Sequence, residues 1–110
     1  MVKLKIIAGI AGLLFWAQSA GADTQQKWFN NAQLTTVRVG YAIASSTSAN
    51  VEILANDNNE YVIRLTGADS LDQAIKLAHE VRSCSGILIR FDTASTNNRK
   101  TVTNFWMTVR

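Results

Sequence analysis

The period of the apolar residues changes once along this chain, and that change constrains the fold more than any other feature. Between Gly67 and Gly86 the apolar residues follow the 3.6-residue period of a helix. The stripe consists of Leu71, Ala74, Ile75, Ala78 and Val81. On both sides of this segment the period is two, which is typical of strands with one buried face. The sequence therefore predicts a mainly β fold with one helix (α+β).

The ends of this helix carry ordinary start and stop signals. Ser70 followed three residues later by Gln73 is a capping box, and Asp72 stands in the first turn, where the helix dipole favours an acid. Gly86 is a C-terminal stop signal, so the helix is predicted to end within residues 83–85.

Five segments have the alternation of strands, three before the helix and two after it. They are residues 34–44, "VEILA", "YVIRLTG", "GILIRFD" and "TVTNFWMTVR". The turn "NDNNE" between the second and third predicts a hairpin, because Asn and Asp tolerate a positive φ. Residues 45–50, "SSTSAN", are predicted to be a loop, and residues 23–32, which carry Trp28 and Phe29, a helical turn.

The order strand, strand, strand, helix, strand, strand is that of the five-stranded OB-fold barrel, and an open α+β sheet would have the same order. We favour the barrel. One domain is expected, over residues 23–110, because the rest of the chain has no linker and no internal repeat.

Residues 1–22 have the features of a secretory signal peptide. Lys3 and Lys5 precede an apolar run, and small residues with Ala20 and Ala22 follow it as a cleavage site. The apolar run is too short for the roughly 20 residues that cross a bilayer. We expect cleavage after Ala22, with Ala20 as the alternative, and a secreted or periplasmic product without a membrane span.

Loss of Lys3 and Lys5 would leave nine basic residues against eight acidic ones, so the exported chain is expected to be nearly neutral. A general nucleic-acid binder keeps a basic excess for phosphate contacts, so no nucleic-acid partner is predicted. Cys84 is the only cysteine, which excludes an intrachain disulfide. We expect its thiol to be buried; an intermolecular disulfide or a reactive thiol is the alternative.

Enzyme chemistry is not predicted. His79 is the only histidine, and it falls on the polar side of the helix, without a second ligand at metal-binding spacing. Cys84 points to another side of the same helix, so the two residues form no catalytic pair. No metal and no cofactor are expected.

Binding is the better prediction. OB-fold ligands lie near the loops that join strands one to two and four to five, which here are residues 45–50 and 93–100. Both loops are rich in hydroxyls and amides, the groups that recognise sugars, although the same residues are common in ordinary turns. Trp28 and Trp106 are candidates for stacking against a ligand or for an interface.

Several of these segments resemble the B subunits of secreted AB5 toxins, which are pentameric OB-fold rings that bind cell-surface glycans. "YVIRLTGADSLDQAIKLAHEV" is similar to the strand, glycine, link and long helix of the cholera and heat-labile enterotoxin type, and "STNNRKTVTNFWMTV" to its Asn-Asn-Lys turn and last strand. "NFWMTVR" resembles the end of the Shiga-type subunit, and "LDQA" the helix of the pertussis-like and typhoid-like subunits.

The resemblance implies a glycan site, whose residues would be Arg64, Asp69, Ser70, Thr96, Asn97, Asn98 and Arg99. Thr96 stands where the enterotoxins have a stacking Trp, Arg64 where they have a glutamate, and their disulfide is absent. The resemblance also implies a homopentamer that binds a glycolipid or glycoprotein and delivers a catalytic A subunit. The alternative hypothesis is an exported immunity or inhibitor protein that binds another protein.

Overall fold

The computed structural model describes residues 23–44, 47–94 and 97–110; the expected signal peptide, residues 1–22, lies outside this part. The strands are β1 (Thr24–Asn30), β2 (Leu34–Tyr41), β3 (Ser48–Ala55), β4 (Glu60–Thr66), β5 (Gly86–Asp92) and β6 (Arg99–Thr108). A short 3-10 turn, η1 (Asn31–Gln33), follows β1, and the helix α1 (Ser70–Ser83) lies between β4 and β5. The prediction of a mainly β fold with one helix is confirmed.

All six strands form one sheet with the order β1-β5-β6-β4-β3-β2. Its neighbouring strands are antiparallel, except that Glu60–Val62 of β4 pairs in parallel with Arg99–Thr101 of β6. The predicted five-stranded barrel is therefore wrong in two respects, because the sheet has six strands and is not closed. The second difference arises because β1 and β2, the two outer strands, do not pair with each other.

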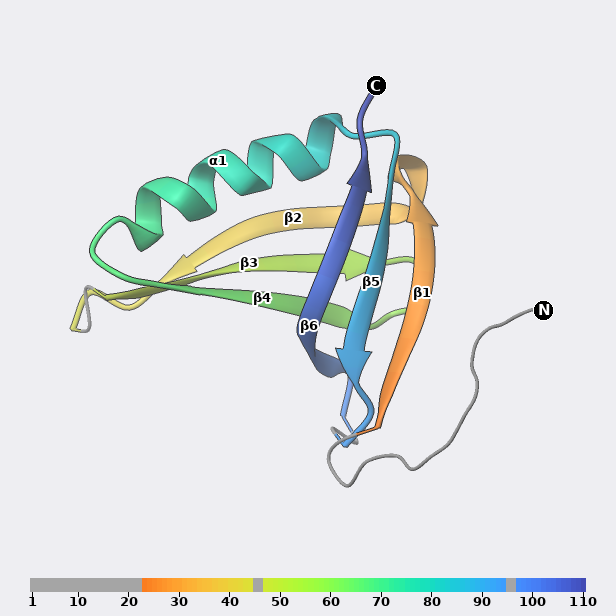
Figure 1. Cartoon of the computed structure of the whole chain (residues 1–110), viewed down its shortest axis with the longest axis horizontal. Coiled ribbons are helices and arrows are strands. Elements are labelled where there is room, and N and C mark those ends of the chain that lie inside the picture. Colours follow the sequence, from red (N-terminus) through yellow and green to blue (C-terminus); the bar gives the residue numbers. More distant parts are fainter. Residues whose placement is uncertain (1–22, 45–46, 95–96) are drawn as a thin grey trace.

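The sheet has two halves that cross in space. In Figure 1, β2, β3 and β4 lie across the view, whereas β6, β5 and β1 lie along its vertical direction. The turn η1 joins the two outer strands and is anchored to both halves. Asn31 N donates to Ser85 O (3.0 Å), and Asn56 N donates to Gln33 O (2.9 Å). The two outer strands are thus brought together at this turn even though no ladder joins them.

The sequence-based prediction of a helical turn over residues 23–32 is wrong. Thr24–Asn30 is a strand that pairs with β5 over its whole length, Trp28 opposite Leu88. Only Phe29 of this strand is buried, so its side chains show little of the alternation that reveals a strand. Pairing with a distant strand, rather than local propensity, determines its conformation.

The core lies between the two halves of the sheet and under α1. Tyr61 is fully buried and stands between two aromatic rings, with centroid distances of 5.4 Å to Phe29 and 5.2 Å to Phe91. Fully buried aliphatic side chains surround these rings: Val51, Ile53, Ala74, Val81, Ile87 and Ile89. The helix packs on β2, β3 and β4, which leaves the opposite surface of the sheet to solvent.

The helix occurs where the period predicts it, but it begins differently from the predicted capping box, in which Ser70 would be the N-cap. Asp69 is the N-cap, and Ser70 is the first helical residue, whose fully buried hydroxyl has no hydrogen-bond partner among the described residues. At the other end, Asn31 Nδ2 donates to Val81 O and Arg82 O, both at 3.0 Å. The turn η1 thereby satisfies carbonyls that a helix end leaves open.

The predicted hairpin turn is confirmed, with Asn58 at a φ of 66°. Two boundaries differ from the prediction. The strand expected over residues 34–44 ends at Tyr41, and Ser48–Asn50, expected in a loop, begins β3. Residues 45 and 46 of that loop lie outside the described part.

Candidate functional site

Two arginines and two glutamates from four strands form an ionic quartet on the outer surface of the sheet, the surface opposite the core. Arg38 reaches Glu52 (Nε to Oε1, 2.6 Å) and Glu60 (Nη2 to Oε2, 2.8 Å). Arg99 reaches the same two residues, Glu60 (Nη1 to Oε1, 2.6 Å) and Glu52 (Nη2 to Oε2, 2.9 Å). Each carboxylate is thus shared by two guanidinium groups.

The register of the strands places these four side chains together. Arg38 stands opposite Glu52 in the β2–β3 ladder, and Glu60 stands opposite Arg99 in the β4–β6 ladder. Gly40 leaves room beside Glu52, because a β-carbon there would lie 3.1 Å from Glu52 Oε2. The side chain of Glu52 is only 11% exposed, against 47% for Arg99.

The environment of Glu52 determines its charge. Burial by itself would raise the pKa of this carboxyl, but the hydrogen bonds and charges of Arg99 and Arg38 outweigh burial and hold the pKa below its usual value. The pKa values of Arg38 and Arg99 are raised in turn, chiefly by their hydrogen bonds to Glu52. The contacts within the quartet therefore favour the charged forms of Glu52, Arg38 and Arg99.

A hollow of about 460 Å³ lies beside the quartet, at the junction of β4 and β6. It is lined by Val62, Arg64, Asn97, Arg99 and Thr101. We call it the β4–β6 hollow. Three of the seven residues predicted for the glycan site, Arg64, Asn97 and Arg99, line it together. Arg64 is exposed and makes no ion pair with any residue that the structure describes.

The end of the loop that precedes β6 is held in place by backbone contacts. Asn97 Oδ1 accepts a hydrogen bond from Arg99 N (2.9 Å), and Asn98 O accepts one from Glu60 N (2.7 Å). The side chains of Asn97 and Asn98 are exposed. Thr96, the third loop residue of the predicted site, lies outside the described residues.

Asp69 and Ser70, also predicted for the site, do not line the hollow. They stand at the start of α1, where Asp69 is exposed and Ser70 is fully buried. Of the described residues that the resemblance implies, Arg64, Asn97 and Arg99 thus line the β4–β6 hollow and Asp69 and Ser70 stand at the start of the helix, while Asn98 does not line the hollow.

A second hollow, of about 380 Å³, opens where β4 and β6 diverge beyond their short ladder. Its lining is Ile63, Arg64, Leu65, Val102, Thr103, Asn104 and Phe105. Arg64 stands between the two hollows and lines both. A smaller, mainly apolar hollow of about 250 Å³ lies at the end of α1 and includes Cys84 and Met107.

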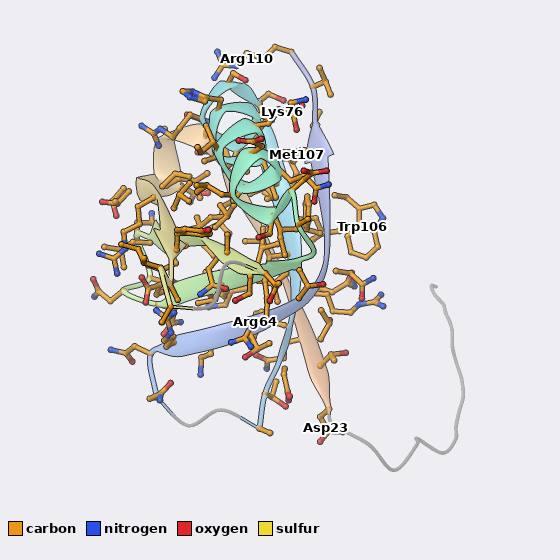
Figure 2. All side chains as sticks on the ribbon, turned by 90° about the vertical axis from the view of Figure 1, so that its left-hand side faces the viewer. Asp23, Arg64, Lys76, Trp106, Met107 and Arg110 are labelled. Atoms are coloured by element: carbon orange, nitrogen blue, oxygen red, sulfur yellow. The ribbon has the colours of Figure 1, made fainter. Side chains whose placement is uncertain are left out.

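The two candidate tryptophans lie in one row on the outer surface of β1, β5 and β6. Trp28 stands opposite Leu88, which stands opposite Trp106. We call these three residues the tryptophan platform. Trp28 is 51% exposed and Trp106 47% exposed. Figure 2 shows Trp106 pointing away from the body of the protein.

Both rings of the platform are supported by a neighbour. The indole of Trp28 lies over Gly86, where a β-carbon would overlap it, and the guanidinium of Arg90 lies 5.4 Å from the centre of a Trp106 ring. The alternation of the last strand places Trp106 on the face opposite Phe105 and Met107 without deciding which face is buried, and the helical turn assigned to Trp28 concealed the row.

A cluster of polar side chains around Asp57 connects β1 to the β3–β4 hairpin. Asp57 Oδ2 accepts hydrogen bonds from Tyr61 Oη (2.6 Å) and Lys27 Nζ (2.9 Å). Burial raises the pKa of Tyr61, and the nearby carboxylate raises it further. Burial alone would raise the pKa of Asp57, but the hydrogen bonds from Tyr61 and Lys27 outweigh it and lower that pKa. These hydrogen bonds give Asp57 a structural role.

The two residues that were considered for catalysis, His79 and Cys84, differ in their exposure to solvent. His79 is exposed on α1, whereas Cys84 is buried at the end of the helix and its Sγ lies 3.0 Å from Val81 O. Within residues 23–44, 47–94 and 97–110, no group of three or more His, Cys, Asp or Glu side chains is placed to hold a metal ion. No helix in this part of the chain is long and apolar enough to cross a bilayer.

Comparison with known proteins finds no match to this chain among family models, curated proteins or solved structures. The resemblance to AB5 B subunits thus stays a hypothesis. The ionic quartet was not predicted from the sequence either. Its four residues point outward from four different strands, so only the strand register brings them together.

Proposed function

We propose that this protein is an exported, non-catalytic glycan-binding subunit and that the β4–β6 hollow is its sugar site. The observation that carries the proposal is the set of groups in the hollow. Arg64 and Arg99 supply cationic donors, Asn97 an amide and Thr101 a hydroxyl, and Val62 adds an apolar side chain to the lining. Neutral and charged donors around an open hollow match the many hydroxyls of a sugar better than a reaction centre.

The charges of the hollow favour a sugar that carries an acidic group. Arg99 is already compensated by Glu52 and Glu60, whereas Arg64 has no carboxylate partner among the described residues. A guanidinium offers two parallel N–H donors that match the two oxygens of a carboxylate. We therefore assign to Arg64 the acidic group, and to Asn97 and Thr101 the neighbouring hydroxyls.

The AB5-type assembly belongs to this proposal. The order β2, β3, β4, α1, β5, β6 is the order predicted for an OB-fold, and β1 is interpreted as an extension of its first strand across η1. On this interpretation the protein forms a homopentameric ring that binds a glycolipid or glycoprotein and delivers a catalytic A subunit. The alternative, an exported immunity or inhibitor protein, is favoured by the half-exposed tryptophan platform, which is suited to a protein partner.

A glycan array with the exported protein tests the site. We expect binding to oligosaccharides that end in a uronic or sialic acid, and weaker binding to the same oligosaccharides after methyl esterification of the carboxyl. The variant Arg64→Ala should weaken binding by about tenfold to a hundredfold, because hydrogen bonds to charged groups contribute about 1.5–3 kcal/mol. Arg64→Lys should retain part of the affinity, since it keeps the charge and loses the bidentate geometry.

The matched control is Lys76→Ala, which removes an exposed cation from α1, away from the hollow lining. Its glycan binding should equal that of the unchanged protein. Absence of any glycan signal, or a signal that Arg64→Ala leaves intact, would contradict the proposed site. A monomeric mass at all concentrations would contradict the ring.

A further inference from the structure

The tryptophan platform lies on the same surface of the sheet as the β4–β6 hollow but near the other end of β6. Arg99 and Thr101 reach the hollow from the start of this strand, and Trp106 belongs to the platform near its end. Neither Trp28 nor Trp106 lines any of the three hollows described above. The platform is thus a separate surface, which the proposed sugar site does not use.

The composition of the platform is that of an interface centre with a polar rim. Two half-exposed indoles flank Leu88. Neutral polar residues occupy the rows on either side of it: Gln26 and Asn104 opposite Arg90, and Asn30 and Thr108 opposite Gly86. Protein interfaces concentrate Trp, other large apolar residues and Arg at their centre and place polar groups around it.

The platform is also preorganised. Gly86 has no side chain, so the Trp28 ring lies directly on the backbone there. The Arg90 guanidinium contacts the Trp106 ring, 5.4 Å from its centre. A partner that lands on these rings finds them largely in place, so little side-chain entropy is lost on binding. Rigid aromatic anchors of this kind dominate binding energies at interfaces.

The positive charge of Arg90 indicates which kind of ligand this surface would favour. Arg90 makes no ion pair with any described residue, so its positive charge on the platform is uncompensated. The acidic residue nearest to it on β5, Asp92, directs Oδ1 to Ala94 N at 2.8 Å, in the turn that follows the strand. A carboxylate of a bound partner could therefore form an ion pair with Arg90.

The geometry points to a docking site for a partner protein. We propose that the tryptophan platform binds a segment that presents an apolar side chain beside an Asp or Glu. The apolar side chain lies on Trp28, Leu88 and Trp106, and the carboxylate pairs with Arg90. Small ligands are usually held in concave sites, whereas the platform is a row across three strands, and this favours a protein over a sugar. The platform and the sugar site can then be occupied together.

A displayed library of random twelve-residue peptides provides the probe. We expect selection on the protein to enrich peptides with Asp or Glu within two residues of Phe, Leu or Trp. Synthetic copies of these peptides should shift the emission of Trp28 and Trp106 to shorter wavelength on binding. Arg90→Glu should weaken them at least tenfold, and changing the peptide carboxylate to Lys should restore binding to Arg90→Glu but not to the unchanged protein.

The controls separate this site from the other surfaces. Ile43→Ser removes an apolar side chain that is 88% exposed, and Lys76→Glu reverses an exposed charge on α1; both should bind the peptides normally. The double variant Trp28→Ser/Trp106→Ser should bind none of them while keeping its circular dichroism and the glycan binding of the unchanged protein. Loss of the proposed sugar binding in Arg64→Ala would leave the peptide result unaffected, so the two proposals fail separately.

Three outcomes overturn the proposal. The first is a selection that enriches no acidic and apolar peptides, or peptides that bind the double tryptophan variant equally well. The second is loss of glycan binding in the double variant, which would make the platform a sugar site. The third is a change from oligomer to monomer in that variant, which would assign the platform to a second copy of this chain.

Discussion

The indole of Trp28 lies on the backbone of Gly86, in the space that the β-carbon of any other residue would occupy. Residue 86 begins β5, and Trp28 belongs to the strand that pairs with it. The side chain of β1 and the missing side chain of β5 therefore fit each other. This contact positions one ring of the tryptophan platform over the start of β5.

Gly86→Ala is expected to destabilise the protein by about 1–3 kcal/mol, the usual cost of adding a group to a packed position. The added methyl group overlaps the Trp28 ring, and it also comes within 3.0 Å of Phe29 O. Chemical denaturation measures the loss, and the fluorescence of Trp28 should show that its ring has moved. The double variant Gly86→Ala/Trp28→Ala should recover part of the stability, because the two changes are coupled. Purely additive losses would show that the ring can move aside without cost.

Glu52→Gln should destabilise the protein by about 1–2 kcal/mol, since it leaves Arg38 and Arg99 side by side with one carboxylate between them. The cost stays below that of a fully buried pair because both arginines are partly exposed. Urea denaturation gives the value. Glu80→Gln, an exposed glutamate on α1 without an ion pair to any described residue, is the matched control and should change stability by less than about 0.5 kcal/mol. Equal changes in stability for the two variants would show that the quartet does not stabilise the protein.

Stability is expected to decline at acid pH. The folded-state pKa values of Glu52 and Asp57 lie below their usual values. Both carboxylates therefore contribute stability above the unfolded-state pKa of about 4, and this contribution is lost as the pH falls through the lower folded-state values. Thermal melting between pH 2 and pH 7 measures the change. Asp57→Asn combined with Glu52→Gln should flatten the acid side of the profile; an unchanged slope would exclude these two groups as its cause.

A second decline is expected at alkaline pH, from Tyr61. Its folded-state pKa is raised, so the folded protein keeps the phenol neutral where the unfolded chain ionises it. The stability from this group is full below the unfolded-state pKa of about 10 and is lost as the pH rises through the folded-state value. Tyr61→Phe should remove this alkaline decline while costing about 1–3 kcal/mol at neutral pH, because Asp57 loses a hydrogen bond. An alkaline decline that persists in the variant would have another origin.

The left-handed conformation of Asn58, with its φ of 66°, makes the hairpin turn sensitive to side-chain shape. Asn58→Ala should cost about 1–2 kcal/mol, because alanine disfavours this region. Asn58→Gly should cost much less, since glycine adopts a positive φ freely. Denaturation of the two variants side by side is the measurement. If alanine and glycine were equivalent, the turn would have to rearrange.

Local signals were sufficient for the helix and for this turn. The helical period over the residues after Gly67 predicted α1, and the Asn-rich sequence predicted a residue with positive φ, because both depend on residues close in the chain. Strand prediction was correct for β2 to β6, where apolar residues recur with a period of two in the sequence, although several boundaries differ by a few residues.

Features that depend on distant residues could not be predicted in this way. The strand β1 contributes one buried side chain, Phe29, and its conformation follows from pairing with β5. The ionic quartet requires the parallel register of Glu60 with Arg99, which no spacing in the sequence reveals. For the candidate sugar site, the resemblance implied a group of residues of which Arg64, Asn97 and Arg99 line one hollow, whereas Asp69 and Ser70 stand apart at the start of the helix.

The pairing of β1 with β5 has a consequence for how fast the chain can fold. Thr24, at the start of the first strand, pairs with Asp92, so the sheet cannot be completed until nearly the whole chain is available. Contacts between residues so far apart close long loops, and such topologies fold slowly compared with helical bundles. During that delay β1 has no partner strand, and its exposed Trp28 and buried Phe29 are both open to other chains. The first strand to be made is thus expected to be among the last to find its place.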